Sequence, residues 1–400
     1  MIELLGKSKE ELRTFCAGLG EPAYRGGQIY HALYAERKFD FARMTNLPAA
    51  LRERLAKEAR VTLPEVKQRF VSSDGSVRYL FGLRGAEEGD FNTENTEDAE
   101  RREKSASEKA QRALPPASVE AVFMPSEGRQ TICISTQAGC AVDCHFCLTA
   151  QLGLVRNLTA GEIVAQVLVA LEEHAAEEKR EKDAGLRPGA TQTRDAVQRN
   201  VVLMGQGEPL LNFEPVMAAL RILLDPEGVG LSAKHVTLST SGIVPGIERL
   251  AQEKVRPKLA ISLNASNDKQ RDALMPINRK YALAALMEAC RNYPLRPWEH
   301  LTFEYVMLGG VNDTADDARR VLRLLGPLRQ VKVNLIPWNP GELPYRESAP
   351  GRIEEFRRIL NDKGVPAFVR YSRGRDVMAA CGQLALVQLR SALPAGGPSL

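Results

Sequence analysis

The chain has 400 residues, of which 44% are hydrophobic and 26% charged, so it can bury a large core and is not disordered throughout. No apolar run reaches the roughly 18 residues of a membrane-spanning helix, and the N-terminal sequence MIELLGKSKEELRTF becomes charged too early for a signal peptide. Seven cysteines, an odd number in a long chain, favour free thiols over a disulfide framework. We therefore expect a cytoplasmic protein with no membrane partner.

The N-terminal part carries the excess positive charge. Residues 1–70 contain 13 Lys and Arg against 9 Asp and Glu, whereas the rest of the chain contains 41 of each. This part combines helical periodicity with turn signals in KSKEELRTFCAGLG, YRGGQIYHALY and LPAALRERLAKEA, which predicts a small helical domain. A solvated helix surface explains the charge about as well as contact with RNA does, so an RNA-binding role for this accessory domain is a hypothesis.

Residues 71–129 favour a β extension of the domain that follows. VRYLFGLRG and SVEAVFMPS are apolar and rich in residues that favour strands. Between them, the stretch of about 87–116 includes the run TENTEDAERREKSASEK. Its composition is that of a solvated or disordered insertion.

From residue 130 to about 390, β-rich segments alternate with longer helical stretches, which is typical of parallel βα units. We expect an α/β fold, a (βα)6 partial barrel. Thr159 and Glu162 form a capping-box pattern at the start of its first helix. A second charged insertion spans about 174–199, and residues 391–400 are expected to be a flexible tail. The six strand candidates, and a seventh that follows them, are QTICIST, NVVLMG, HVTLST, PKLAISL, LTFEYVM, VKVNLIP and PAFVRYS.

Three cysteines with short spacing follow the first of these strands. Cys140, Cys144 and Cys147 are separated by three and two residues, and three thiolates can hold three corners of a 4Fe–4S cluster while one iron stays open for a substrate. A structural zinc site that includes His145 is the alternative, although the ring lies directly between two ligands and no second CxxC follows. Cys16 and Cys290 lie alone in helix-like stretches and are assigned no role.

The motif CxxxCxxC at the start of βα repeats resembles the radical S-adenosylmethionine (SAM) superfamily. In that superfamily a glycine-rich turn and an acid after the second strand hold the methionine ammonium group, and Gly207 and Glu208 in GQGEP match them. Ligand sites of barrels gather at the carboxyl ends of strands, where LSTSG, ISLNASND and IPWNP occur. The further residues expected to bind the cofactor are Ser239, Ser262, Leu263, Asn264 and Asn339.

Over nearly its whole length the chain resembles the ribosomal RNA large subunit methyltransferase N family, the dual-specificity adenine-2 RNA methyltransferases. The matching segments are TICISTQAGCAVDCHFCLTAQLG, VVLMGQGEPLLN, VTLSTSGIVP, LMPINRKY, VNLIPWNP and RGRDVMAACGQL. The family pattern has histidine at Asn264 in many members, which leaves that residue's contact with the cofactor open.

This resemblance implies a radical mechanism that consumes two SAM molecules per methylation. Cys381 is methylated by the first, and the radical made from the second removes hydrogen from that methyl group, which then adds to carbon 2 of adenine. Cys133, which alternation with Ile132 and Ile134 turns towards a cavity, resolves the covalent RNA adduct through a transient disulfide. Glu120 matches the general base that removes the ring proton, a role for which burial would have to raise its pKa.

The implied substrates are an adenosine of the peptidyl-transferase region of 23S rRNA and the adenosine 3′ of the anticodon in tRNA. An external electron donor such as flavodoxin and a monomeric state are also expected. A related adenine carbon-8 methyltransferase that confers antibiotic resistance is the near alternative. A noncatalytic metal-containing RNA-binding protein is the alternative from another class, for which the thiol pair of Cys133 and Cys381 would be unnecessary.

Overall fold

A computed structural model describes residues 1–84, 117–183, 197–341 and 343–384. The first predicted insertion, 87–116, and the predicted tail, 391–400, lie outside the described residues. The second insertion is partly described, because the helix that precedes it continues to Asp183. The strand that follows begins at Gln198.

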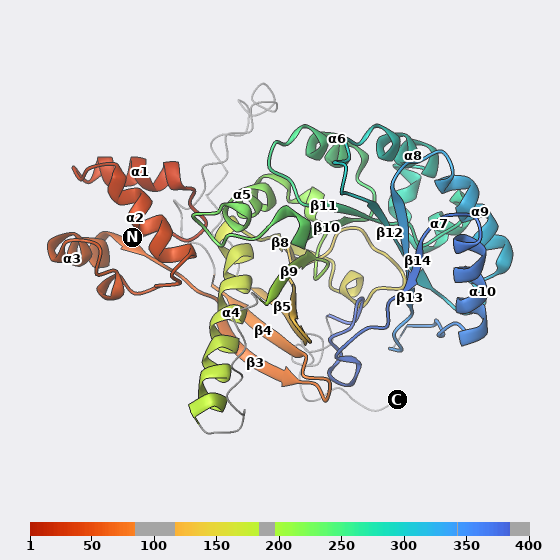
Figure 1. Ribbon diagram of the computed structural model, residues 1–400, viewed down its shortest axis with the longest axis horizontal. Coiled ribbons are helices and arrows are strands. Elements are labelled where there is room, and N and C mark those ends of the chain that lie inside the picture. Colours follow the sequence, from red (N-terminus) through yellow and green to blue (C-terminus); the bar gives the residue numbers. More distant parts are fainter. Residues whose placement is uncertain (85–116, 184–196, 342, 385–400) are drawn as a thin grey trace, which may run out of the picture.

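One ten-stranded sheet forms the centre of the molecule, in the order β14-β13-β12-β11-β10-β9-β6-β5-β4-β3 (Figure 1). The strands from β6 to β14 pair in parallel, and β5, β4 and β3 continue the sheet with antiparallel pairing. This arrangement confirms the predicted α/β partial barrel, with β14 as an additional parallel strand. The strands are β3 Glu65–Val71, β4 Val77–Leu83, β5 Ala117–Ser126, β6 Arg129–Cys133, β9 Gln198–Leu203, β10 Val236–Thr240, β11 Lys258–Ser262, β12 Leu301–Met307, β13 Val331–Pro337 and β14 Ala367–Val369.

Helices connect the parallel strands and cover the outer face of the barrel (Figure 1). The first begins with the predicted capping box, in which Thr159 Oγ1 accepts from the backbone N–H of Glu162 at 3.2 Å and the Glu162 carboxylate accepts from the N–H of Thr159 at 2.9 Å. The barrel helices are α4 Ala160–Asp183, α5 Phe213–Leu224, α6 Val244–Gln252, α7 Asp268–Leu274, α8 Leu283–Asn292, α9 Ala315–Leu325 and α10 Pro350–Asn361.

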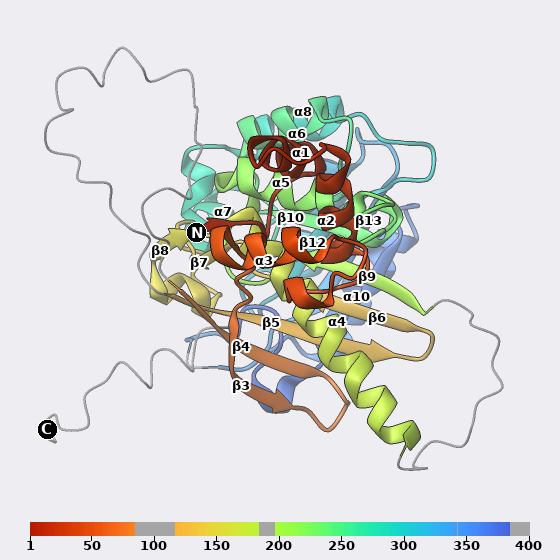
Figure 2. The same ribbon diagram turned by 90° about the vertical axis from the view of Figure 1, so that its left-hand side faces the viewer.

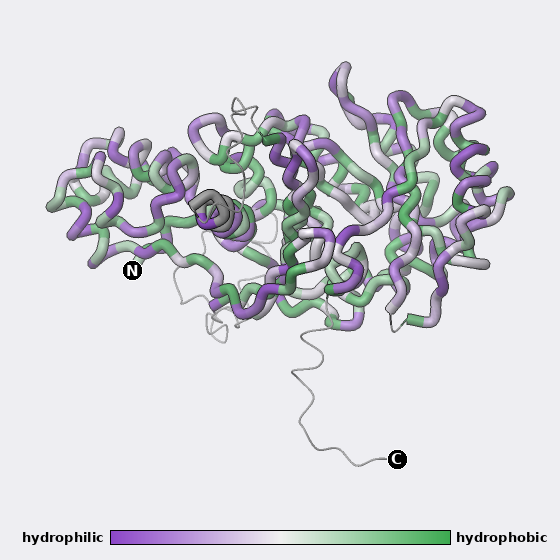
Figure 3. The backbone as a smooth tube through the Cα atoms, turned by 60° about the horizontal axis from the view of Figure 1, so that its bottom comes forward, coloured by the Kyte–Doolittle hydropathy of each residue, from purple (hydrophilic) through white to green (hydrophobic). Residues whose placement is uncertain are grey.

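The main core lies between the strands and these helices, and Figure 3 shows hydrophobic residues concentrated along the strands. Ile132 and Ile134 are buried in this core. Cys133 lies between them in sequence and belongs to a separate small apolar cluster, because successive side chains of a strand point to opposite faces. Cys133 therefore lies on the opposite face of the strand from Ile132 and Ile134, but it packs in this apolar cluster and does not line a cavity as predicted.

The N-terminal helices α1 Lys9–Gly18, α2 Tyr24–Tyr34 and α3 Ala49–Glu58 pack beside α4 and α5 (Figures 1 and 2). Tyr30 Oη donates to Asp225 Oδ2 at 2.9 Å, just after α5, and Arg37 pairs with Glu172 on α4. A short parallel pair, β1 Ile2–Glu3 with β2 Ala59–Arg60, joins the two ends of this module. None of the helices in the described ranges is long and apolar enough to cross a membrane.

The strand β3 was not predicted, since residues 65–70 were assigned to the helical domain. Its sequence EVKQRFV is mostly exposed and carries three charged residues, and β3 is the edge of the sheet. Charged side chains on edge strands discourage pairing with other chains, and they also hide the hydrophobic alternation by which a strand is recognised. The β extension therefore begins at Glu65, six residues before the expected start at residue 71.

Candidate active site

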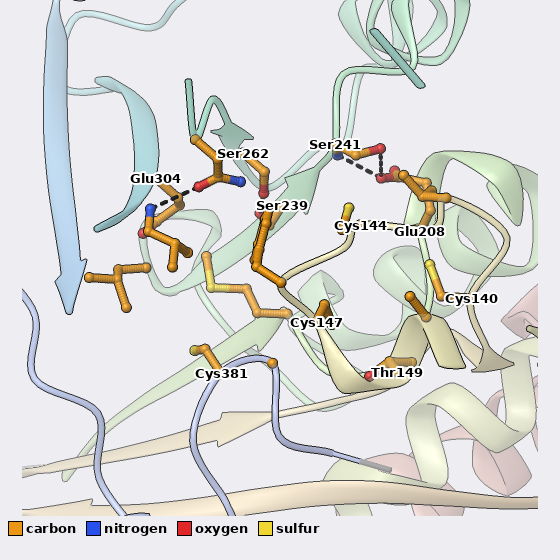
Figure 4. A pocket seen from close by; sticks show the side chains of 18 of the residues that line it. Cys140, Cys144, Cys147, Thr149, Glu208, Ser239, Ser241, Ser262, Glu304 and Cys381 are labelled. Atoms are coloured by element: carbon orange, nitrogen blue, oxygen red, sulfur yellow. Dashed lines mark hydrogen bonds between the residues drawn. The ribbon is translucent and has the colours of Figure 1, made fainter. Parts of the chain in front are cut away.

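A pocket opens at the carboxyl ends of the parallel strands, as expected for a βα barrel. Together with the solvent space at its mouth it encloses about 1060 Å³. In Figure 4, Cys140, Cys144, Glu208 and Ser241 lie on one side, and Cys381 and Glu304 lie on the other. The pocket therefore has a thiol-rich end and an opposite end that carries the C-terminal cysteine.

The loop between β6 and α4 carries the three clustered cysteines. It includes a short antiparallel pair, β7 Gln137–Gly139 with β8 Leu154–Asn157. Gly139 has φ +76°, and a Cβ there would lie 1.8 Å from the carbonyl oxygen of Gly153, so only glycine allows the two segments to cross so closely. The Cys140 N–H donates to the same oxygen at 2.8 Å. This crossing closes the base of the cysteine loop.

Cys140, Cys144 and Cys147 all line the pocket and are free thiols. Burial raises the pKa of Cys140 to about 12 and also raises the pKa values of Cys144 and Cys147. Neighbouring thiolates raise the pKa of Cys144 further. Three thiolates are therefore unfavourable here unless a positively charged group is bound between them.

The zinc alternative requires His145 as a ligand beside the three thiols. In the described part of the chain, no group of three His, Cys, Asp or Glu side chains is placed to hold one metal ion. Zinc needs all its ligands within about 2.3 Å of one centre, whereas each thiolate of a 4Fe–4S cluster binds a different iron. His145 is half-exposed, its Nε2 lies 3.8 Å from Asp143 Oδ2, and it does not line the pocket with the thiols.

The glycine-rich turn after β9 places Glu208 in the pocket wall. Gly207 has φ +100°, and a Cβ there would lie 2.6 Å from Gln137 Cβ. Glu208 is buried, and its Oε2 accepts from the Ser241 N–H at 2.6 Å and from Ser241 Oγ at 2.7 Å. Burial raises the pKa of Glu208, while the Ser241 hydrogen bonds oppose this shift. Glu208 is therefore a fixed hydrogen-bond acceptor suited to a cationic group.

Two of the other predicted cofactor residues have hydroxyl groups that face one another in the pocket wall. Ser239 Oγ and Ser262 Oγ are 3.5 Å apart. Leu263, in contrast, is fully buried in the main core and is not among the residues that line the pocket. Its prediction as a cofactor contact can therefore apply only to its backbone.

The amide side chains of Asn264 and Asn339 line the pocket but are engaged with the protein. Asn264 has φ +55°, and its Oδ1 accepts from the Val306 N–H at 2.8 Å. Asn339 Nδ2 donates to Ser372 Oγ at 2.9 Å and to the Cys381 carbonyl at 3.2 Å. Asn339 thus holds the loop that carries Cys381.

Cys381 lies in a loop that packs against the cysteine-rich loop. The Leu148 N–H donates to the Gly382 carbonyl at 2.8 Å, and Thr149 Oγ1 donates to the Leu384 carbonyl at 2.9 Å. The residue is exposed as a whole and its thiol is free. Desolvation of the thiol raises its pKa, and the Arg370 guanidinium opposes this shift.

Cys133 lies behind the pocket lining, on the side of the Cys381 loop. It packs with Val122, Ala379 and Leu384 in a small apolar cluster. Its pKa is raised to about 12 by burial and, to a smaller extent, by charge repulsion from the nearby Cys381 thiol. The two predicted catalytic thiols, which are 248 residues apart in sequence, are thus brought to the same region.

Glu120 is fully buried on β5 and does not line the pocket. It is two residues from Val122, which pairs with Cys133, so its side chain lies on the same face of the sheet as that cluster. Its Oε1 is 3.1 Å from Arg78 Nη1. Burial raises the pKa of Glu120 to about 7, and Arg78 opposes this shift. An exposed strand carboxylate, the other interpretation of the sequence, is excluded.

Sequence reasoning missed Arg271, a fully buried cation next to the thiol-rich end. Its guanidinium donates to the carbonyls of Ser241 at 2.5 Å and of Leu263 and Ser262 at 3.2 Å each. The Arg271 charge also opposes the rise in the pKa of Cys144. No local pattern signals this residue, because the carbonyls that it contacts come from two separate segments, at the ends of β10 and β11.

The comparisons with known proteins agree with this geometry. Residues 2–61 match the ribosomal RNA large subunit methyltransferase N-terminal domain, and residues 190–325 match the radical SAM superfamily. The chain is 45% identical over 387 residues to the probable dual-specificity RNA methyltransferase RlmN of Koribacter versatilis, which covers 93% of this chain and 98% of that protein. The dual-specificity RNA methyltransferase RlmN of Anaeromyxobacter dehalogenans is 43% identical, over 96% of this chain and 91% of that one.

A solved structure supports the same assignment. The crystal structure of a radical SAM methyltransferase from Sphaerobacter thermophilus superposes with a TM-score of 0.78 at 39% identity, and covers 96% of this chain and 99% of that chain. The family resemblance found in the sequence is confirmed. The chain therefore belongs to the RlmN family of dual-specificity RNA methyltransferases and is a radical SAM enzyme.

Proposed function

We propose that this enzyme methylates carbon 2 of adenosine in RNA, at the peptidyl-transferase region of 23S rRNA and 3′ of the anticodon in tRNA. The observation that carries the proposal is the pair of free thiols, Cys381 and Cys133, at the end of the pocket that carries the C-terminal cysteine. Cys381 lines the pocket opposite the cysteine-rich end, and Cys133 packs behind the same loop. A simple methyl transfer to a nucleophilic nitrogen would need neither thiol.

The cofactors are assigned to the two ends of the pocket. Cys140, Cys144 and Cys147 would hold one 4Fe–4S cluster, which supplies the electron that cleaves SAM. Glu208, fixed by Ser241, would bind the methionine ammonium group, and Ser239, Ser262 and the backbone near Leu263 would contact the rest of the cofactor. Two molecules of SAM are consumed in each cycle.

Cys381 carries the methyl group in this scheme. Its sulfur would first attack the methyl carbon of one SAM molecule, so that Cys381 takes the methyl group, S-adenosylhomocysteine leaves and the thiol proton is lost. The methyl group would then give up a hydrogen atom to the adenosyl radical made from a second SAM molecule, and the carbon that remains would bond to C2 of adenine. The unpaired electron of this adduct would return to the oxidised cluster. Because the loop of Cys381 is held by Asn339 and by the backbone of Leu148, the sulfur stays at the pocket during these steps.

Cys133 and Glu120 complete the cycle. Glu120 is the proposed acceptor of the C2 proton, since a carboxylate with a pKa near 7 is suited to proton transfer at neutral pH. The Cys133 sulfur then attacks the Cys381 sulfur. A sulfur–sulfur bond forms as the bond between Cys381 and the new carbon breaks, and that carbon becomes a methyl group by taking a proton. A reductant must cleave the disulfide before the next cycle.

The RNA and protein partners follow from this reaction. A target adenine has to leave its stack to reach a pocket of this kind. The helical module with the excess positive charge remains the proposed RNA-binding element. An external electron donor such as flavodoxin, a monomeric state and a cytoplasmic location are proposed with it.

The substitution Cys133→Ala tests this function. Removal of the resolving thiol should stop the cycle after the carbon–carbon bond has formed, so RNA covalently attached through Cys381 is expected to accumulate. The measurement is denaturing electrophoresis followed by mass spectrometry of the crosslinked peptide, after anaerobic reaction with SAM, reductant and RNA. Cys290→Ala removes a buried thiol outside the site and should behave as the wild type.

The outcomes separate the alternatives. Free RNA alone from the Cys133 variant, while the wild type is active, would contradict the assigned thiol. Mass spectrometry of the wild-type product distinguishes C2 from C8 methyladenosine. A protein that carries iron but never yields 5′-deoxyadenosine would be a noncatalytic metal protein.

A further inference from the structure

Glu304 is a buried carboxylate in the pocket wall to which neither the sequence nor the proposed cycle assigns a role. It lies on β12 and is 4% exposed. Its Oε1 accepts from Asn334 Nδ2 at 2.9 Å and is 3.7 Å from Arg370 Nη1. Its Oε2 is buried and has no hydrogen-bond partner among the described residues. Figure 4 shows Glu304 at the end of the pocket away from Glu208.

An unpaired carboxylate oxygen is costly inside a protein. Burial raises the pKa of both Glu304 and Glu208. The two differ in their hydrogen bonds, because Glu208 Oε2 accepts two from Ser241, whereas Glu304 Oε2 accepts none from the described residues. Such a residue lowers stability unless something else donates to it. A ligand in the pocket can supply the missing donor.

The neighbours of Glu304 limit what this ligand group can be. Glu304 pairs with Ser262 across adjacent strands, and Ser262 Oγ faces Ser239 Oγ at 3.5 Å. The amides of Asn264 and Asn339 are already engaged with the protein. The polar groups with free capacity in this part of the wall therefore include two hydroxyls, a carboxylate and the Arg370 guanidinium, next to apolar Val306 and Ile336.

We propose that Glu304 binds the ribose of the adenosyl group through its 2′- and 3′-hydroxyls, which donate to the carboxylate. A carboxylate accepts hydrogen bonds only, and its two oxygens match two adjacent hydroxyl donors. An acidic residue recognises ribose hydroxyls in the same way in dinucleotide-binding folds. Glu208 and Glu304 then divide the cofactor between them, with the ammonium group at one carboxylate and the sugar at the other. The assignment rests on the proposed function, because it requires SAM in this pocket.

The test compares Glu304→Gln with the wild type, both with reconstituted cluster. The ligands are S-adenosylhomocysteine, which binds without reacting, and its 2′-deoxyadenosyl analogue, and affinity is measured by anaerobic calorimetry. Glutamine keeps the size of the side chain but loses the charge and one acceptor. A charge-assisted hydrogen bond corresponds to a factor of about 10 to 100 in affinity, so the wild type should prefer S-adenosylhomocysteine by roughly tenfold or more. The variant should bind it about tenfold more weakly and lose most of that preference.

Thermal unfolding distinguishes ligand binding from a structural role. Glu304→Gln should leave the melting temperature unchanged or higher, because it removes an unpaired buried charge. The matched control is Glu299→Gln, another buried carboxylate, which lies just before the same strand and 3.4 Å from buried Arg256. It should lower the melting temperature without changing affinity for either ligand.

Several results would overturn the inference. One is that Glu304→Gln binds both ligands as tightly as the wild type. Another is that it binds both more weakly by the same factor. A third is that its melting temperature falls while its preference for S-adenosylhomocysteine over the deoxy analogue stays the same. The target RNA also carries a ribose, so RNA with 2′-deoxyadenosine at the target position forms another arm. The wild type and the variant are then compared for their preference for the ribose form of each ligand. If Glu304→Gln loses the preference for the unmodified RNA but keeps the preference for S-adenosylhomocysteine over its deoxy analogue, Glu304 contacts the ribose of the RNA and the assignment fails. A wild-type protein that binds no S-adenosylhomocysteine would refute the proposed function instead.

Discussion

Replacement of any one of Cys140, Cys144 and Cys147 by alanine is expected to abolish cluster assembly and reduce SAM cleavage below detection. Each thiolate binds a separate iron in a three-cysteine site, so two remaining thiols cannot hold the cluster in place. The three side chains have no substitute, because His145 faces the surface beside Asp143. The measurements are iron and sulfide content after anaerobic reconstitution, and 5′-deoxyadenosine formed with a chemical reductant.

The chain supplies matched controls for this experiment. Cys16 and Cys290 are buried free thiols outside the pocket lining, and Cys16→Ala and Cys290→Ala should retain iron and cleavage activity. Circular dichroism should show that all the variants are folded, since the cysteine loop lies outside the main core. A Cys144 variant that retained both full iron content and cleavage would contradict the ligand assignment.

The strands of the barrel were predictable because β-rich segments alternate with longer helical stretches along the chain. The position of the pocket could be predicted from these strands. Once parallel strands are recognised, polar residues such as Ser239 and Ser262 must meet at their carboxyl ends. The thiol cluster was predictable from local spacing alone, since its three members lie in one loop.

Other features depend on contacts between distant segments, which local sequence patterns do not contain. Arg271 is important only because two segments, at the ends of β10 and β11, direct their carbonyls towards it. The pair of Arg78 and Glu120 requires β4 and β5 to align across an insertion. Glu304 did leave a signal, because it is the single acidic residue in the otherwise uncharged strand LTFEYVM and acidic residues are rarely buried without a partner.

Arg78→Met is expected to destabilise the protein in a pH-dependent way. Arg78 and Glu120 are both almost completely buried, with Nη1 and Oε1 3.1 Å apart. Arg78 Nη1 also lies 3.4 Å from the Met378 carbonyl, in the loop that carries Cys381. Removing one partner of a buried ion pair costs about 3–5 kcal/mol, because the other charge is left without compensation.

The sign of the pH effect follows from Glu120. Its pKa in the folded protein is already about 7, above the ordinary value of 4.5, and loss of the guanidinium must raise it further. A carboxyl group with a raised folded pKa favours folding fully below the unfolded pKa, and this contribution is lost as the pH rises through the folded pKa. In the wild type, the contribution of Glu120 to the free energy of unfolding should therefore be lost between about pH 4.5 and 7. In the variant, the free energy of unfolding should continue to fall above pH 7. The difference in unfolding free energy should be small at pH 5 and largest near pH 8.

Urea unfolding of the full chain at these two pH values measures the difference. The double variant Arg78→Met with Glu120→Gln should recover most of the stability at pH 8, because no buried charge remains. A loss of equal size at both pH values would mean that packing of Arg78 on the Phe70 ring, 4.2 Å away, and not its charge, stabilises the fold. If the pair behaves as expected, Arg78 keeps the pKa of Glu120 low enough for the carboxylate to accept a proton near neutral pH, and the same contact connects the base to the Cys381 loop.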